Sequence, residues 1–213
     1  MRCFQGRLFT VDGMIEDEAP LKKEIYEQIR YYATTSVARR IEHIMQAIKL
    51  ACASEPPEIQ TDRIHVRNGT YFVDGHFTPE KEYCMNRLPI TYVLEAPAPT
   101  RWLQFLNELL YEEDIPALQE YIGYCLLPVT KAQKMLLMVG KGGEGKSRIG
   151  LILRELFGNS MYTGSLQKVE TNRFARADLE YKLLLVDDDM KTEALPQTNN
   201  IKTLVTLEDK IDI

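Results

Sequence analysis

Apolar residues recur along the first part of the chain at spacings that predict a strand followed by two helices. The segment CFQGRLFTV, residues 3–11, is typical of a strand that turns at Asp12-Gly13. Apolar positions about every three to four residues predict a helix over residues 20–34 and a second helix that starts at Ser36. A serine at that point can cap the helix N-terminus, and Pro56-Pro57 ends the helical pattern.

The next segments predict β-hairpins and then a helical connection. Three short runs, RIHV, TYFV and HFT, are separated by Asn68-Gly69 and Asp74-Gly75, which are strong hairpin signals. We interpret residues 1–95 as a small α+β module, which is followed by the linker EAPAPT at residues 95–100. Residues 96–131 show two apolar stripes at helical spacing and are predicted to form a helical connecting segment.

After residue 131 the pattern predicts a strand, a glycine-rich loop and a helix in direct succession. The apolar run Met135–Val139 is expected to be a buried parallel strand, and apolar residues from Ile149 to Phe157 predict a helix that stops at Gly158. Between them, GKGGEGKS fits the phosphate-binding pattern GxxxxGK[ST] at every fixed position. A flexible turn can match this pattern by accident, but the flanking strand and helix are the context that a phosphate-binding loop requires.

The residue types in this loop suit ATP phosphates and Mg²⁺. Glycines let backbone N–H groups point at phosphate oxygens, and a helix N-terminus adds partial positive charge. We expect Lys146 to reach the β- and γ-phosphates and the Ser147 hydroxyl to bind Mg²⁺, whereas Glu144 stands at a variable position. The predicted nucleotide-binding residues are Gly140, Lys141, Gly142, Gly143, Glu144, Gly145, Lys146 and Ser147.

A second apolar run, KLLLV, ends in three carboxylates, Asp187, Asp188 and Asp189. An acid just beyond the end of a parallel strand lies beside the phosphate loop in such sheets. We expect Asp187 to hold Mg²⁺ through water and Asp188 to orient or deprotonate the attacking water, with Asp189 as a weaker candidate. Lys146, Asp187 and Asp188 are therefore the predicted catalytic residues. Without the upstream loop, a strand followed by a solvated acidic turn would explain the same residues equally well.

Composition and charge narrow the class of protein. The chain has 213 residues, of which 45% are hydrophobic and 27% charged, values typical of globular proteins. No apolar run approaches the ~18 residues of a membrane span, so we expect a cytoplasmic protein with no membrane partner. The 4 cysteines and 3 histidines are scattered and form no zinc or disulfide pattern. Residues 132–213 carry 12 basic and 12 acidic residues, so the net charge of −5 resides in residues 1–131, and any DNA contact is expected from a local patch in the second part or from several subunits.

The quoted motifs resemble the superfamily 3 helicase domain of phage- and plasmid-borne primase–helicases, including the satellite-phage and poxvirus types. The segments that carry this resemblance are EYIGYCLLPVTKAQKMLLMVGKGGEGKS, ETNRFARADLEYKLLLVDDD and NNIKTLVTLEDKIDI. Two preceding segments, VRNGTYFVDGHFTPEKEY and PTRWLQFLNELL, resemble the module before the helicase in those proteins. The resemblance implies an α/β P-loop NTPase core, AAA+-like with a parallel sheet, over residues 132–213. Gly140–Ser147 would be its Walker A motif, and Asp187 and Asp188 its Walker B acids.

The resemblance also implies a ring, usually a hexamer, that hydrolyses ATP and translocates on single-stranded or forked DNA during replication in a bacterial host. Lys202 and Lys210 lie in a segment that resembles the start of a motif leading to a DNA-contacting hairpin. The family's sensor residue and arginine finger are expected after Ile213. We therefore expect a core that is incomplete at its C-terminus and binds nucleotide with little hydrolysis. Two alternatives stay open: a replication initiator or loader ATPase without unwinding, and a non-catalytic interaction module with a relic loop.

Overall fold

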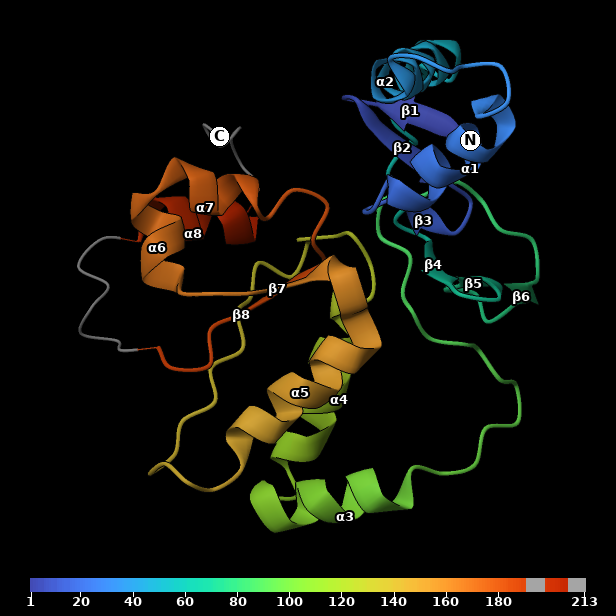
Figure 1. Cartoon of the computed structure of the whole chain (residues 1–213). Coiled ribbons are helices and arrows are strands. Elements are labelled where there is room, and N and C mark those ends of the chain that lie inside the picture. The colour runs from blue at the N-terminus through green and yellow to red at the C-terminus, as the bar shows by residue number, and fades with distance from the viewer. Residues whose placement is uncertain (191–197, 207–213) are drawn as a thin grey trace. The chain divides into compact units, whose positions relative to one another are not determined.

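The computed structural model describes residues 1–190 and 198–206, which fall into two compact units (Figure 1). The first unit comprises residues 1–58 and 81–85. The second comprises residues 59–80 and the chain from residue 86 onward. The division expected from the sequence, at residues 95 and 131, stays a prediction.

The first unit packs two helices against a small antiparallel sheet. Its elements are β1 (Arg2–Phe4), β2 (Arg7–Thr10), β3 (Gly13–Met14), α1 (Ala19–Ile29) and α2 (Val37–Ala51). Strands β1 and β2 pair with each other, as do β2 and β3. Cys3, Leu8, Ile25 and Met45 are buried together and form the core of this unit. The two helices that the apolar spacing predicted are confirmed.

Two local predictions in this unit were wrong. The single strand expected over residues 3–11 is a hairpin, because Gln5 and Gly6 adopt φ of +47° and +75° and turn the chain between β1 and β2. Ser36 precedes α2 but adopts φ of +55° and makes no side-chain cap hydrogen bond. A cap requires extended backbone at that residue, so the hydroxyl does not reach the first free N–H groups of the helix.

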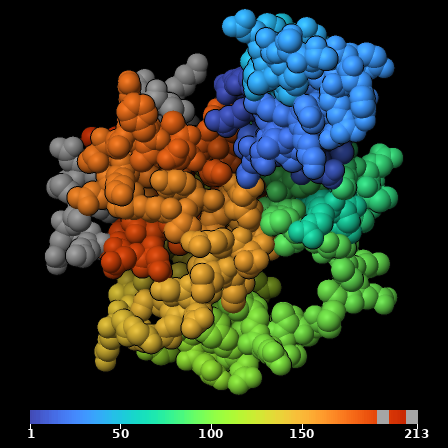
Figure 2. All heavy atoms as spheres, viewed as in Figure 1, coloured from blue at the N-terminus to red at the C-terminus, as the bar shows by residue number. Residues whose placement is uncertain are grey.

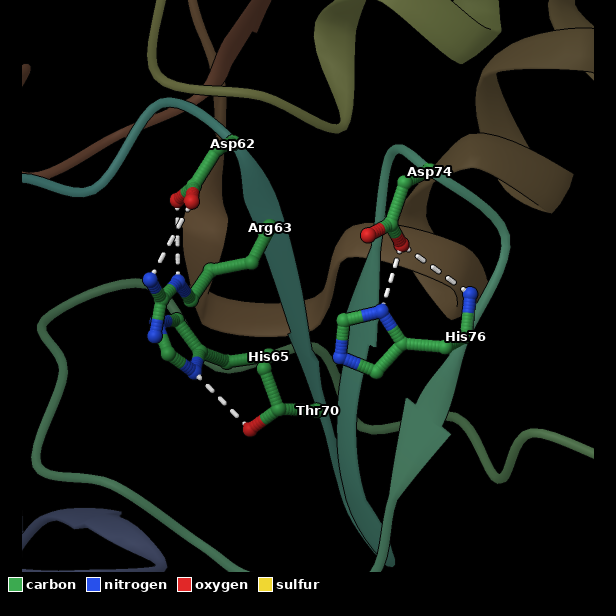
Figure 3. Close-up of polar contacts among 6 residues, drawn as sticks. All are labelled: Asp62, Arg63, His65, Thr70, Asp74 and His76. Atoms are coloured by element: carbon green, nitrogen blue, oxygen red, sulfur yellow. Dashed lines mark hydrogen bonds and ion pairs between the residues drawn. The ribbon is translucent and has the colours of Figure 1, made fainter.

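The second unit begins with an antiparallel sheet that confirms the predicted hairpins. Its strands are β4 (Arg63–Val66), β5 (Gly69–Phe72) and β6 (Phe77–Thr78). Figure 3 shows that polar side chains pair locally within it: buried His65 lies 3.5 Å from Thr70 across β4 and β5, and exposed His76 lies 2.5 Å from Asp74. Arg63 likewise pairs with its neighbour Asp62 at 2.9 Å. These two histidines therefore have local partners in the sheet.

The rest of the second unit consists of helices around a two-stranded parallel sheet. Its elements are α3 (Thr100–Leu109), α4 (Asp114–Cys125), α5 (Lys146–Phe157), the 3₁₀ helix η1 (Gly158–Ser160), β7 (Met161–Thr163), α6 (Leu166–Thr171), α7 (Arg173–Ala177), β8 (Leu184–Val186) and α8 (Asn199–Thr206). Leu106, Leu118, Ile149, Phe157 and Leu184 share one buried cluster. This cluster joins α3, α4 and α5 to β8, so it holds the helix after the loop against the strand before the acids.

The expected strand at Met135–Val139 is wrong for this structure. These residues form no β-ladder, and Val139 is 86% exposed. A strand buried in a parallel sheet needs backbone partners, and the parallel sheet found in residues 1–190 and 198–206 consists of β7 and β8, which pair with each other. The described part of the chain is thus mixed α/β, and the full AAA+-like core stays a prediction. Within the described residues, no helix is long and apolar enough to cross a membrane.

Candidate functional site

The glycine-rich loop turns directly into helix α5. Gly142, Gly143 and Gly145 adopt φ of +93°, +73° and +102°, a backbone region that residues with a Cβ rarely enter, and Gly145 is the N-cap of α5. Residues 141–144 are exposed, and Figure 2 shows the gold segment that carries the loop at the visible surface. The first N–H groups of a helix lack acceptors one turn earlier, and in α5 they follow directly on this loop, where the N–H of Arg148 bonds to the carbonyl of Gly145 at 2.9 Å. This geometry suits an anionic ligand.

A pocket of about 760 Å³ brings the predicted site residues together. One part of its lining is the loop, from Gly140 and Gly142 to Ser147, and another is the acidic run Asp187–Asp189 after β8. Apolar residues of α4 and of the segment 135–139 complete the wall. Of the predicted loop residues, Lys141 does not line this pocket. The structure therefore places both predicted motifs around one cavity although about 40 residues separate them in the sequence.

Asp187 is held in place by backbone N–H groups. One carboxylate oxygen, Oδ2, accepts a hydrogen bond of 2.8 Å from the backbone N–H of Leu166, the first residue of α6. The other, Oδ1, accepts one of 3.3 Å from the backbone N–H of Asp189. A carboxylate has about four lone-pair directions, so Asp187 retains acceptor capacity toward the pocket. Asp187 is half-buried, whereas Asp188 and Asp189 are exposed.

Ser147 and Asp187 are the residues that fit Mg²⁺, since both present oxygen donors to the pocket. In the described ranges, no group of three or more His, Cys, Asp or Glu side chains is arranged to hold a metal by itself. A site with few protein ligands is the usual arrangement for Mg²⁺, which takes its remaining ligands from substrate phosphates and water. The donor set is thus suited to Mg²⁺ that arrives with a nucleotide.

Glu144 makes two hydrogen bonds within the loop that the sequence did not indicate. Its Oε2 accepts a hydrogen bond of 2.9 Å from Lys146 Nζ, and its Oε1 accepts one of 3.2 Å from the backbone N–H of Lys141. The hydrogen bond from Lys146, with a smaller contribution from Lys141, holds the pKa of Glu144 below its usual value. The carboxylate is therefore ionised at neutral pH and faces the cation that the loop pattern assigns to phosphate.

The α4 residues in the pocket lining are uncharged. Burial raises the pKa of Tyr121 to about 12 and that of the Cys125 thiol to about 11, and both residues lie on α4. At neutral pH both groups are protonated. The lining thus combines charged residues of the loop and the acidic run with uncharged residues of α4.

Glu170 is a second residue that sequence reasoning missed. It is buried on α6, where its carboxylate accepts hydrogen bonds from the backbone N–H groups of Asn200 (3.1 Å) and Ile201 (2.9 Å) at the start of α8. Nothing in the sequence distinguishes this glutamate from a surface residue of an amphipathic helix. Lys202 is exposed on the same α8, while Lys210 lies outside the described residues.

The segment that carries both motifs matches a family model. Residues 138–213 match a family described as "Family of unknown function (DUF5906)". A search of curated proteins found none that matches this chain. The matched segment begins just before the loop and includes α5, β7 and β8, so it spans both motifs of the candidate site. Because the family has no assigned function, the match adds no chemical role to these residues.

Proposed function

We propose that this chain is the ATP-binding part of a DNA replication helicase of the primase–helicase type. The observation that supports this proposal best is the single pocket that joins the loop Gly140–Ser147 to Asp187 and Asp188. A glycine-rich loop at a helix N-terminus, with an acid at the end of a nearby parallel strand, is the arrangement that binds a nucleoside triphosphate with Mg²⁺.

Each residue has a distinct role in this proposal. Lys146 neutralises charge on the terminal phosphates, and backbone N–H groups of the loop and of α5 bind the phosphate oxygens. Ser147 and Asp187 would hold Mg²⁺, which would supply charge stabilisation for phosphoryl transfer when bound. Asp188, exposed beside Asp187, accepts the proton of the attacking water.

The DNA-linked part of the proposal rests on the resemblance to superfamily 3 helicases. A ring that couples hydrolysis to translocation on single-stranded or forked DNA would place several copies of this chain around one strand. Exposed Lys202 on α8 is the candidate contact to DNA phosphates among the described residues.

Binding of MgATP to the full chain, measured by titration calorimetry, tests the nucleotide site. We expect Lys146→Ala and Asp187→Asn to weaken binding at least tenfold. Lys168→Ala should leave it unchanged, because Lys168 is an exposed lysine on α6 outside the pocket lining. Equal affinity of the wild type and Lys146→Ala would refute the nucleotide site. DNA-stimulated hydrolysis with strand displacement favours the helicase, and hydrolysis without displacement favours an initiator or loader.

A further inference from the structure

The Glu144 carboxylate accepts hydrogen bonds from two of the donors that a phosphate-binding loop offers to its ligand. Lys146 Nζ and the backbone N–H of Lys141 both point at its carboxylate, at 2.9 and 3.2 Å. A carboxylate and a phosphate present the same kind of charged oxygen acceptors to such donors. The loop therefore holds an anion from within the chain.

The ion pair lies inside the curve of the loop. A Cβ built on Gly140 would overlap both Glu144 Oε2 and Lys146 Nζ, which shows that these two atoms rest directly against the Gly140 backbone. Gly140 opens the loop and Lys146 closes it, so the carboxylate sits between the two ends. This close approach is possible because residue 140 has no side chain.

The ion pair between Glu144 and Lys146 can break without disturbing the core of the protein. The Glu144 side chain is 43% exposed and that of Lys146 25% exposed, so rotation of the glutamate into water breaks no core packing. Neither partner is fixed by burial. An incoming anion can therefore displace the carboxylate without unfolding the loop.

We propose that Glu144 is an internal competitor for the phosphate position and thereby lowers the affinity of this loop for nucleotide. This inference rests on the proposed function of the loop. A bound phosphate must take Lys146 from Glu144 and then lies close to its negative charge. Both effects oppose binding, so removal of the carboxylate strengthens it. The gain expected for an exposed ion pair is about two- to fivefold in affinity, and relief of the repulsion between like charges adds to it.

The test measures MgATP affinity of the full chain for the wild type, Glu144→Gln and Glu144→Ala. Glu155→Gln is the matched control, because Glu155 is an exposed glutamate on the same helix as Lys146 but does not line the pocket. It removes the same charge from the protein. Lys146→Ala serves as the reference for loss of the site.

We expect Glu144→Gln and Glu144→Ala to bind MgATP about two- to tenfold more tightly than the wild type, with Glu155→Gln unchanged. If both Glu144 variants bind like the wild type, or more weakly, while Lys146→Ala abolishes binding, the competitor role is wrong and the nucleotide site stands. An equal gain in Glu155→Gln would also overturn it, because the effect would then be one of net charge. If no protein in the series binds MgATP, the proposed function fails and the inference falls with it.

Discussion

Replacement of Glu170 by alanine should destabilise the N-terminus of helix α8. Glu170 is 9% exposed, and its carboxylate accepts hydrogen bonds from the backbone N–H groups of Asn200 and Ile201, at 3.1 and 2.9 Å. It also lies 3.4 Å from the Asn200 side-chain amide. These are N–H groups that no helical partner can satisfy, so Glu170 acts as a cap supplied by another helix.

The expected loss follows from the burial of the two donors. A hydrogen bond to a charged acceptor contributes about 1.5–3 kcal/mol, and a buried donor left without a partner costs about 1–3 kcal/mol. Ile201 is 6% exposed, so its N–H stays unsatisfied in the variant, whereas the half-buried Asn200 regains part of its hydration. We therefore expect Glu170→Ala to lower the free energy of opening of α8 by about 2–4 kcal/mol. Glu170→Gln keeps one acceptor oxygen and should lose about half as much.

Hydrogen exchange over residues 199–206 measures this effect locally. A loss of about 2–4 kcal/mol corresponds to exchange about 30- to 700-fold faster, since about 1.4 kcal/mol is a factor of ten. Glu155→Ala, which removes an exposed glutamate of α5, should leave the exchange of this helix unchanged. Unchanged exchange in Glu170→Ala would refute the assignment of Glu170 as the cap. Faster exchange in both variants would mean that global unfolding, not the cap, is being measured.

Four further predictions concern the pocket and the hairpin sheet. Asp187→Ala should destabilise the protein by about 1 kcal/mol in urea unfolding, because the N-terminus of α6 loses its acceptor, in addition to its effect on MgATP binding. Cys125 should be alkylated at pH 8 about 100-fold more slowly than an ordinary thiol, because burial raises its pKa from 9.0 to about 11; fast labelling seen by mass spectrometry would contradict this. The pKa of Cys125 is raised in the folded state, so its contribution to stability is fully present below pH 9 and is lost as the pH rises through about 11. Cys125→Ala should therefore lose less stability than the wild type between pH 9 and pH 11. Gly69→Ala should destabilise the second unit, because a Cβ there would overlap the backbone carbonyl of Thr78; an unchanged melting temperature would contradict it.

Elements with a strong local signal were predicted well from the sequence. The helices after Ser36 and after the loop and the hairpins around residues 63–78 follow from periodicity and from Asn-Gly or Asp-Gly turns, which act within a few residues. The prediction of a strand at residues 135–139 was wrong because strand formation is not decided locally. This apolar run is compatible with a buried strand, but strand formation depends on a partner elsewhere in the chain, and sequence spacing does not specify that partner.

In the candidate site too, local features were predicted from the sequence and contacts that depend on the folded chain were not. The glycine pattern predicted a loop before a helix, and the positive φ of Gly142, Gly143 and Gly145 shows why glycine stands at those positions. The hydrogen bonds of Glu144 to Lys146 and Lys141 could not be predicted, because the motif leaves position 144 variable and only the folded loop brings the carboxylate to the lysine. Glu170 was missed because its partners lie about 30 residues away.

The carboxylates of Asp187 and Glu144 each accept two hydrogen bonds, but only that of Asp187 is held by backbone N–H groups alone. Asp187 bonds to the first residue of α6 and to Asp189, so its orientation is part of the fold and persists when a ligand enters. The exposed Glu144 side chain accepts hydrogen bonds from Lys146 and from the backbone N–H of Lys141, and a bound phosphate would need both of these donors. Changes at Asp187 should therefore alter stability and binding together, whereas changes at Glu144 should alter binding alone. This difference separates an acid that builds the site from one that competes for it.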